Sequence, residues 1–255
     1  MKIGLFAANA VGHEIAKFFG DQHEPPACIV LSADDSRTLQ ANIVAASGVS
    51  DPNRVFSSET LGDPQIVARL RDLGLDLILL AWWPYILKPS LLEVPRLGCL
   101  NFHPSFLPYN RGKHYNFWAI VEGAPFGVTI HWVDKSVDGG DIAFQSRIDT
   151  TWEDTGATLY HKAQQEMVQL FKEKFAEIKK GEIPRIPQDL TRGSFHYARE
   201  LEPACHIELD QSYTARTLLN LLRARTFPPH PASWFCEGSD CYEVRIEIKK
   251  VAGKL

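Results

Sequence analysis

Short apolar runs alternate with amphipathic stretches over the first half of the chain. The expected strands are Lys2–Phe6, Ala27–Leu31, Leu75–Ala81 and Cys99–Phe102, and the helices expected between them include Val11–Phe19 and Val67–Leu73. Consecutive parallel strands need a crossover connection, which is usually a helix. The pattern therefore predicts an α/β domain with a mostly parallel sheet and helices on both faces.

The second half of the chain predicts two further strands and one long helix. Gly127–Val133 and Ile142–Ile148 are the strands, joined by a loop over 134–141. The helix begins near Asp154 or Thr155, either of which can cap it, and ends at Lys179-Lys180-Gly181. Its apolar face is formed by Leu159, Ala163, Met167, Leu170, Phe171, Phe175 and Ile178.

Two prolines after the long helix predict a domain boundary. Pro184 and Pro187 follow the glycine that ends this helix, so residues 1–185 form the predicted main domain. Residues 186–255 form a small C-terminal α+β region with a helix over Ala215–Ala224 and a strand over Tyr242–Ile248.

Composition narrows the class of protein. The chain has 255 residues, of which 45% are hydrophobic and 23% are charged, as in globular proteins. Its formal net charge is -4, which lacks the basic excess typical of a protein that binds nucleic acid through phosphates. The longest apolar stretch, Leu77–Trp83, is far below the ~20 residues that cross a bilayer. We expect a cytoplasmic protein with no nucleic acid partner and no membrane contact.

The five cysteines do not form a disulfide pattern. Their number is odd and they are scattered through a chain large enough to bury a core, which is typical of reduced cytosolic thiols. A zinc site is the alternative for Cys236 and Cys241, which lie near His230 with Cys205-His206 upstream. Their spacing matches no compact zinc motif, so we expect no metal.

The densest cluster of unusual residues runs from Asn101 to Trp118 and begins at the end of a predicted strand. Asn101 and His103 are two residues apart at the end of this strand, so their side chains point to the same face. Asp138 opens an Asp-Gly-Gly turn in the 134–141 loop. An amide, an imidazole and a carboxylate suffice for acyl transfer to an amine, because they stabilise an oxyanion, move protons and orient the imidazole or a water. Ser105 lacks the Gly-x-Ser-x-Gly surroundings of a hydrolase nucleophile.

An ordered set of motifs resembles the folate-dependent formyltransferases over roughly residues 1–180. That group formylates glycinamide ribonucleotide, methionyl-tRNA or nucleotide-linked amino sugars. The motifs are Asn101-x-His103-Pro104-Ser105-x-Leu107-Pro108, Arg111-Gly112, Gly127-Val128-Thr129-Ile130-His131 and Asp138-Gly139-Gly140. The resemblance implies a Rossmann-like fold and N10-formyltetrahydrofolate as the formyl donor.

The resemblance also implies roles for individual residues. Asn101 would stabilise the tetrahedral intermediate, His103 would act in proton transfer, and Asp138 would hold His103 or a relaying water. Asp141 lies in the same loop, but the family's catalytic aspartate precedes the two glycines. The donor's pteridine would lie between two loops, whose candidate residues are Trp83, Pro84, Tyr85, Ile86, Asp134, Lys135, Val137 and Asp138.

Length and two further segments favour the sugar N-formyltransferases. The purine enzyme lacks a tail like 190–255, and the tRNA enzyme carries a longer, basic C-terminal barrel that a net charge of -4 does not supply. Arg111–Trp118 and Arg223–Pro229 resemble segments of the sugar enzymes. The implied acceptor is a nucleotide-linked amino-dideoxyhexose, such as GDP-perosamine or a dTDP-4-amino-4,6-dideoxyhexose, for O-antigen or another surface polysaccharide. Such enzymes are commonly homodimers.

Candidate residues for the nucleotide sugar follow the Asn/His motif. The cations of Arg111 and Lys113 suit a pyrophosphate, and the rings of Tyr115 and Trp118 suit a base. The complete set is Arg111, Lys113, His114, Tyr115, Asn116 and Trp118.

Other interpretations stay open at this point. His103 alone could be a structural histidine, Asp138 a turn residue, and His131 with the loop aspartates a cation site. Formylation of glycinamide ribonucleotide or methionyl-tRNA is the nearest alternative function. A non-catalytic nucleotide-binding module is a further one, although the first turn, 7–12, lacks the Gly-x-Gly-x-x-Gly of dinucleotide sites.

Overall fold

The structure is a computed structural model that describes residues 1–253. It divides into two compact units, each built from separate stretches of the chain. Unit 1 comprises Met1–His103, Thr129–Ser146 and Gln164–Gln188. Unit 2 comprises Pro104–Val128, Arg147–Ala163 and the residues from Asp189 onward. The division predicted after residue 185 lies close to the end of unit 1, and its assignment to two functional domains stays a prediction.

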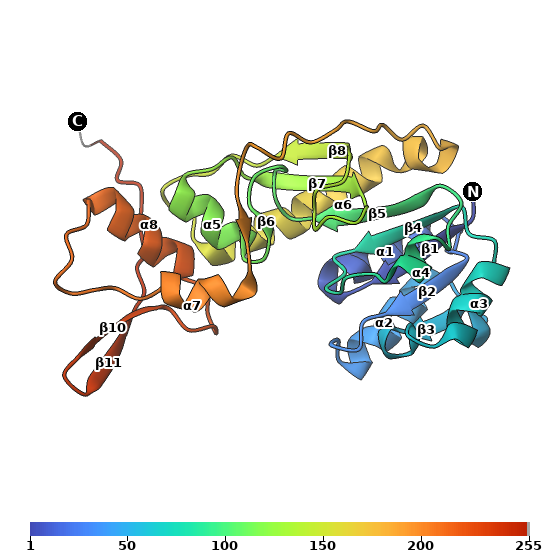
Figure 1. Cartoon of the computed structure of the whole chain (residues 1–255), viewed down its shortest axis with the longest axis horizontal. Coiled ribbons are helices and arrows are strands. Elements are labelled where there is room, and N and C mark those ends of the chain that lie inside the picture. The colour runs from blue at the N-terminus through green and yellow to red at the C-terminus, as the bar shows by residue number, and fades with distance from the viewer. Residues whose placement is uncertain (254–255) are drawn as a thin grey trace. The chain divides into compact units, whose positions relative to one another are not determined.

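Unit 1 is built around a seven-stranded sheet whose strand order is β3-β2-β1-β4-β5-β7-β8 (Figure 1). Its strands are β1 (Ile3–Ala7), β2 (Cys28–Leu31), β3 (Val55–Ser57), β4 (Leu77–Ala81), β5 (Gly98–His103), β7 (Gly127–Trp132) and β8 (Ile142–Arg147). The first five strands pair in parallel, whereas β7 runs antiparallel to β5. The sheet is therefore mixed and mostly parallel, as the sequence predicts.

Helices cover both faces of this sheet. On one face, α3 (Pro64–Asp72) and α4 (Pro89–Leu92) pack over an apolar cluster that includes Phe6, Leu70 and Ile78. On the other face, α1 (Asn9–Asp21) meets α6 (Gly156–Lys180) through aromatic rings. The ring of Phe18 lies 5.4 Å from Phe171 and 5.0 Å from Phe175. The α/β class is confirmed.

The helix α2 (Arg37–Ser47) is missing from the sequence prediction, and it packs against α1 at a glycine. A Cβ atom at Gly20 would lie 2.1 Å from the carbonyl oxygen of Ala46, so only glycine permits this close approach. Only Ile43 and Ser47 of α2 are buried, which explains why its periodicity is weak in the sequence. Two short 3-10 turns, η1 (Pro52–Arg54) and η2 (Ser58–Thr60), flank β3.

Unit 2 contains the small C-terminal α+β part that the sequence predicts. The elements of unit 2 include β6 (Arg111–Gly112), α5 (Tyr115–Glu122), β9 (Phe195–His196), η3 (Ala198–Glu200), α7 (Leu201–Ala204), α8 (Ala215–Arg225), β10 (Ser233–Glu237) and β11 (Asp240–Val244). The predicted strand over Tyr242–Ile248 is wrong beyond Val244. The antiparallel register of the hairpin places Val244 opposite Ser233, the first residue of β10, so β11 has no partner further on.

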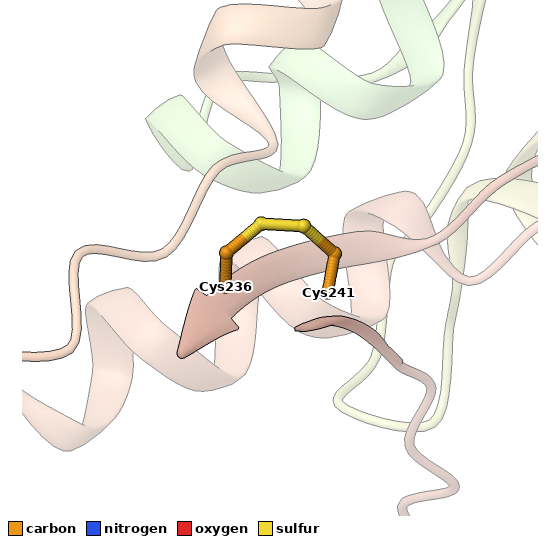
Figure 2. Close-up of a disulfide and its surroundings, with 2 residues drawn as sticks. All are labelled: Cys236 and Cys241. Atoms are coloured by element: carbon orange, nitrogen blue, oxygen red, sulfur yellow. A yellow bond between two sulfur atoms is a disulfide. The ribbon is translucent and has the colours of Figure 1, made fainter. Parts of the chain in front are cut away.

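The hairpin also corrects the expectation that all five cysteines are reduced. Cys236 and Cys241 are directly opposite each other in the register and form a disulfide (Figure 2). Cys28, Cys99 and Cys205 are free and buried, and burial raises the pKa of Cys28 and of Cys99 to about 12. The odd count and wide spacing concealed a pair that only the strand register brings together.

None of the helices within residues 1–253 combines the length and the apolar character that a bilayer crossing requires.

Candidate active site

The candidate site begins where β5 and β7 lie side by side in unit 1. The register places Asn101 opposite His131 and His103 opposite Thr129. Because alternate residues of a strand face the same side, Asn101 and His103 project toward the same face, as the two-residue spacing predicts. His131 of β7 comes to that face because it is the cross-strand partner of Asn101.

His131 is a buried partner of Asn101. The sequence alone does not predict that the two residues lie opposite each other. The residue is 2% exposed, and its Nδ1 lies 2.9 Å from the carbonyl oxygen of Trp132. A carbonyl can only accept, so Nδ1 carries the hydrogen and Nε2 of the neutral ring is left as an acceptor. The amide nitrogen Nδ2 of Asn101 donates to this Nε2 at 3.1 Å. His131 therefore fixes which way the Asn101 amide faces.

Asp138 reaches the same point from the loop between β7 and β8. Its Oδ1 lies 3.4 Å from Nδ2 of Asn101, 3.4 Å from Nδ1 of His103 and 3.6 Å from Nε2 of His131. The side chain of Asp138 is 12% exposed, so this carboxylate is largely withdrawn from water. The amide, imidazole and carboxylate expected from the sequence lie within contact of one another.

The backbone of the loop explains why Asp138 can reach inward. Asp138 has a φ of 54°, which is uncommon for a residue with a side chain. A Cβ at Gly140 would lie 2.0 Å from the carbonyl oxygen of Trp132, so the second residue of the Gly139-Gly140 pair must be glycine. Gln188 holds the turn from outside, with its Nε2 donating to the carbonyl oxygens of Asp138 and Gly140 at 3.0 and 2.6 Å.

Neither His131 nor Gln188 was assigned a role of this kind from the sequence alone. His131 lies inside the Gly127–His131 motif, and the only signal available was a histidine within an otherwise apolar strand. Gln188 is 50 residues from Asp138 and carries no motif. Pairing across strands and between distant segments was needed to find them.

The first predicted donor loop follows β4 and borders a cavity. Trp83 is buried, with its ring centroid 5.2 Å from Phe6 and 5.3 Å from Tyr85, whereas Ile86 is 83% exposed. The hydroxyl of Tyr85 lies 3.3 Å from Oγ of Ser32. A cavity of about 380 Å³ opens beside this loop, lined by Ala33, Ser58, Glu59, Leu61, Gly62, Trp83, Tyr85, Ile86, Leu87, Lys88 and Leu91.

The second predicted donor loop is exposed except at its end. Asp134, Lys135 and Val137 are exposed, and the side chain of Asp138 turns inward. Oδ1 of Asp134 accepts from the backbone N–H of Ser136 at 2.7 Å, which shapes the turn. Among residues 1–253, no three His, Cys, Asp or Glu side chains group in a way that would hold a metal ion.

The residues predicted to contact the nucleotide sugar belong to unit 2, at β6 and the start of α5. Arg111 is half-buried and Lys113 is exposed. Asn116 is buried, with Nδ2 donating to the carbonyl oxygen of Gly156 at 2.8 Å. One face of Trp118 is covered by the ring of His196, at a centroid distance of 3.8 Å and 6° between planes.

His114 and Tyr115 sit at the start of α5 in an unusual setting. His114 has a φ of 60° and is the N-cap of the helix. Burial, together with the charges of Arg225 and Lys113, lowers the pKa of His114, which favours a neutral ring at pH 7. Burial raises the pKa of the Tyr115 hydroxyl well above its usual value, with a contribution from Tyr160.

An α/β sheet with an amide, an imidazole and a carboxylate gathered at the end of a central strand is the arrangement expected of an acyl-transferring enzyme. Residues 22–174 match the family model described as formyl transferase, which is more than half of the chain. The chain belongs to the formyl transferase family. Residues 200–250 match the N-formyltransferase dimerization C-terminal domain.

Similar proteins include enzymes with different acceptors. Over 163 residues the chain is 36% identical to the methionyl-tRNA formyltransferase of Synechococcus sp. (strain JA-3-3Ab), which covers 64% of this chain. The match spans only 50% of the length of that relative. The structure of a sugar N-formyltransferase from Shewanella sp. FDAARGOS_354 has the same fold, with a TM-score of 0.81 and 19% identity over 98% of this chain and 99% of that one.

A third similar protein has been solved with its ligands. It is the formyltransferase PseJ from Anoxybacillus kamchatkensis, in complex with UDP-4,6-dideoxy-4-formamido-L-AltNAc and tetrahydrofolate. The TM-score is 0.54 and the identity 25%, over 80% of this chain and 89% of that one.

Proposed function

We propose that this enzyme transfers a formyl group from N10-formyltetrahydrofolate to the amine of a nucleotide-linked amino-dideoxyhexose. The observation that carries the proposal is the convergence of Asn101, His103 and Asp138 around one carboxylate oxygen. These three groups supply an oxyanion donor, a proton carrier and an orienting anion, which is what transfer of a formyl group to an amine requires.

The donor loops fit a flat, partly apolar ligand. The cavity of about 380 Å³ beside Trp83, Tyr85 and Ile86 has the size of a small-molecule site and carries aromatic and aliphatic walls. Among the described residues, the buried indole nitrogen of Trp83 has no acceptor, so a ligand carbonyl could satisfy it. When bound, the folate supplies an activated formyl carbon. Trp83, Pro84, Tyr85, Ile86, Asp134, Lys135, Val137 and Asp138 are the residues that we propose to hold it.

The longer of the two hydrogen bonds that Asn101 donates indicates how this residue acts. Its Nδ2 donates at 3.1 Å to Nε2 of His131 and at 3.4 Å to Oδ1 of Asp138. The longer bond, to Asp138, is the weaker one. We propose that Asn101 gives up this bond and donates to the formyl oxygen instead when that oxygen gains charge during attack. His131 keeps its bond and holds the amide in the direction needed for the oxyanion.

His103 and Asp138 manage the proton released by the attacking amine. Nδ1 of His103 faces Oδ1 of Asp138 at 3.4 Å, so the carboxylate stabilises the ring when it becomes an imidazolium. The opposite nitrogen, Nε2, is the atom that exchanges a proton with the reacting groups. The amine must be deprotonated to attack, so activity should rise from acidic to mildly alkaline pH.

A nucleotide-linked sugar is the acceptor that the comparisons favour. The overlap with the Shewanella sugar enzyme covers almost the whole of both chains, whereas the match to the tRNA enzyme stops at half its length. PseJ was solved with a UDP-linked formamido sugar and tetrahydrofolate. Methionyl-tRNA and glycinamide ribonucleotide are the alternative acceptors.

We propose that the start of α5 contributes contacts to the nucleotide sugar. Arg111 and Lys113 supply cations for a diphosphate, and His114 lies near the charges of Arg225, Lys113 and Glu202. Tyr115, Asn116 and Trp118 complete the proposed contact region. We further propose a homodimer, which is supported by the match of residues 200–250 to a dimerization domain. We also propose a cytoplasmic location and a product that enters O-antigen or another surface polysaccharide.

The test is a panel of acceptors. The enzyme is incubated with N10-formyltetrahydrofolate and with GDP- and dTDP-linked amino sugars, glycinamide ribonucleotide or initiator methionyl-tRNA, and the products are weighed by mass spectrometry. We expect a mass gain of one formyl group on at least one nucleotide sugar, at a rate about 100-fold lower or less with an Asn101→Ala variant. Formylation confined to glycinamide ribonucleotide or methionyl-tRNA would overturn the choice of acceptor.

A further inference from the structure

His196 is a histidine of unit 2 that the proposed mechanism does not use, and both of its ring nitrogens face carboxylates. Nε2 lies 2.7 Å from Oε1 of Glu122 on α5, and Nδ1 lies 2.9 Å from Oε2 of Glu200 in η3. An ionised carboxylate can only accept a hydrogen bond, so both nitrogens must donate. The geometry is that of a doubly protonated ring, and the side chain is 12% exposed.

The same ring is stacked on Trp118. The two ring planes are nearly parallel, with 6° between them and 3.8 Å between centroids. A cationic imidazole over the face of an indole is an attractive cation–π arrangement. The ring therefore makes three contacts, two with carboxylates and one with an aromatic face.

These contacts hold the strand that carries the proposed phosphate ligands. His196 belongs to β9, which pairs in parallel with β6 so that Gly112 lies opposite His196. The backbone N–H of Lys113 donates to the carbonyl oxygen of His196 at 3.0 Å, and that of Arg111 donates to Ser194 at 3.1 Å. A Cβ at Gly112 would lie 2.3 Å from the carbonyl oxygen of His196, so the two strands touch at their backbones.

Glu122 connects the histidine to a second anchor of the same segment. Its other oxygen, Oε2, accepts from Nδ2 of Asn110 at 2.9 Å and from Oγ of Ser194 at 2.7 Å. Asn110 directly precedes β6, so Glu122 ties both ends of the contact between β6 and β9 to α5. The other charged groups on the adjoining elements are engaged elsewhere: Arg111 donates to the carbonyl oxygen of Leu190, and Arg199 lies over Tyr197.

We propose that His196 is a positioning residue for the acceptor: as an imidazolium held by Glu122 and Glu200, it fixes Arg111 and Lys113 in place to bind the nucleotide diphosphate. The inference rests on the proposed function, because it takes Arg111 and Lys113 as ligands of the acceptor. Loss of the two ring N–H donors would leave Glu122 and Glu200 without this partner, which loosens β9 and with it β6. Binding of the acceptor would therefore weaken, while binding of the formyl donor would not.

The kinetic test uses His196→Phe, which keeps a flat ring over Trp118 but has no N–H, and His196→Gln, which keeps one donor. We expect His196→Phe to raise the KM for the nucleotide sugar about tenfold or more, with kcat and the KM for the donor within about twofold. His196→Gln should lie between His196→Phe and the wild type. The matched control is His206→Phe, since the ring of His206 also lies against a tryptophan, Trp234, at a centroid distance of 4.2 Å, and pairs with a single carboxylate, Glu208.

The split between KM and kcat is a readout that a merely structural residue would not give. The KM for the nucleotide sugar should rise in His196→Phe alone, and His206→Phe should keep the KM of the wild type. An unchanged KM in His196→Phe, or an equal fall of kcat for every substrate, would overturn the role of His196.

Amide hydrogen exchange keeps the two proposals distinguishable. The amides of Arg111 and Lys113 are bonded to Ser194 and His196, so they should lose protection in His196→Phe. This loss, together with a wild type that formylates no nucleotide sugar, would support the positioning role of His196 and refute the proposed function. Unchanged protection of both amides in His196→Phe would refute the positioning role of His196, whatever the activity.

Discussion

At the scale of single residues, the amide of Asn101 is the most constrained group of the candidate site. It donates to His131 and Asp138, and both acceptors are themselves fixed, one by the carbonyl of Trp132 and the other by a loop that Gln188 holds. An oxyanion donor stabilises charge best when it is already oriented, because no reorganisation is then needed during the reaction.

Removal of Asn101 or His103 should therefore affect chemistry more than binding. We expect Asn101→Ala and His103→Ala each to lower kcat by about 100-fold or more, with KM values changed less than about threefold. Steady-state kinetics would measure this, with His23→Ala as the control because His23 is exposed on the surface of unit 1. A variant of either residue that keeps full turnover would contradict the assigned chemistry.

The role of His131 can be separated from that of Asn101 by the choice of substitution. His131→Phe removes the acceptor for Asn101 and should lower kcat about tenfold, because the amide is then free to rotate. His131→Gln offers a carbonyl oxygen in place of Nε2 and should recover part of this loss. Equal activity in the two variants, measured at saturating substrates, would show that the acceptor does not matter.

At the scale of elements, the start of α6 depends on a buried carboxylate. Asp154 accepts from Nζ of Lys162 at 2.8 Å, from the backbone N–H of Thr151 at 2.8 Å and from Oγ1 of Thr158 at 2.9 Å. Burial raises the pKa of Asp154, but these hydrogen bonds outweigh it and hold the pKa below its usual range. A depressed pKa means that the stabilisation is present above about pH 4, the unfolded value, and is lost as the pH falls through the folded value.

Asp154→Asn should accordingly destabilise the protein by about 1–3 kcal/mol at neutral pH and by less in acid. Denaturant unfolding at several pH values would measure this. The control is Asp149→Asn, since Asp149 is exposed and lies a few residues before Asp154. A loss of stability that is independent of pH would mean that the ionised carboxylate is not the source.

The hairpin β10–β11 carries the second prediction at this scale. A bridge between residues 236 and 241 closes a very short loop, so in the chain-entropy model it contributes about 2 kcal/mol. The double variant Cys236→Ser with Cys241→Ser should lose about this much stability, and a reductant should lower the wild type to the same level. A reductant that lowers the stability of the double variant as well would point to an effect on something other than this bridge.

At the scale of the whole molecule, the features that the sequence predicts are those determined by local pattern or by motif. β4 is fully buried, and its sequence is an uninterrupted apolar run. Asn101, His103 and Asp138 can be predicted as one site because the motif that contains them is specific. The features that were missed depend on pairing between distant segments. His131 acquires its place from the β5–β7 register, Gln188 from a contact across 50 residues, and the disulfide from the β10–β11 register.

Local signals also failed at two helices. α5 begins at Tyr115, and the side chain of its N-cap residue, His114, makes no capping hydrogen bond, so no start signal precedes the helix in the sequence. α2 buries few side chains and shows little periodicity for that reason. The candidate catalytic centre could thus be predicted in outline, while its supporting residues required the fold.

The central claim is that the formyl group moves from the folate donor to the nitrogen of a nucleotide-linked sugar. The most direct measurement is nuclear magnetic resonance of the reaction between isotopically labelled formyl donor and the nucleotide amino sugar that the acceptor panel identifies. We predict that the labelled carbon appears as a formamide coupled to the sugar amine with the wild-type enzyme, and about 100-fold more slowly or less with Asn101→Ala. Label released as free formate, or carried by an acceptor other than the sugar amine, would contradict the account.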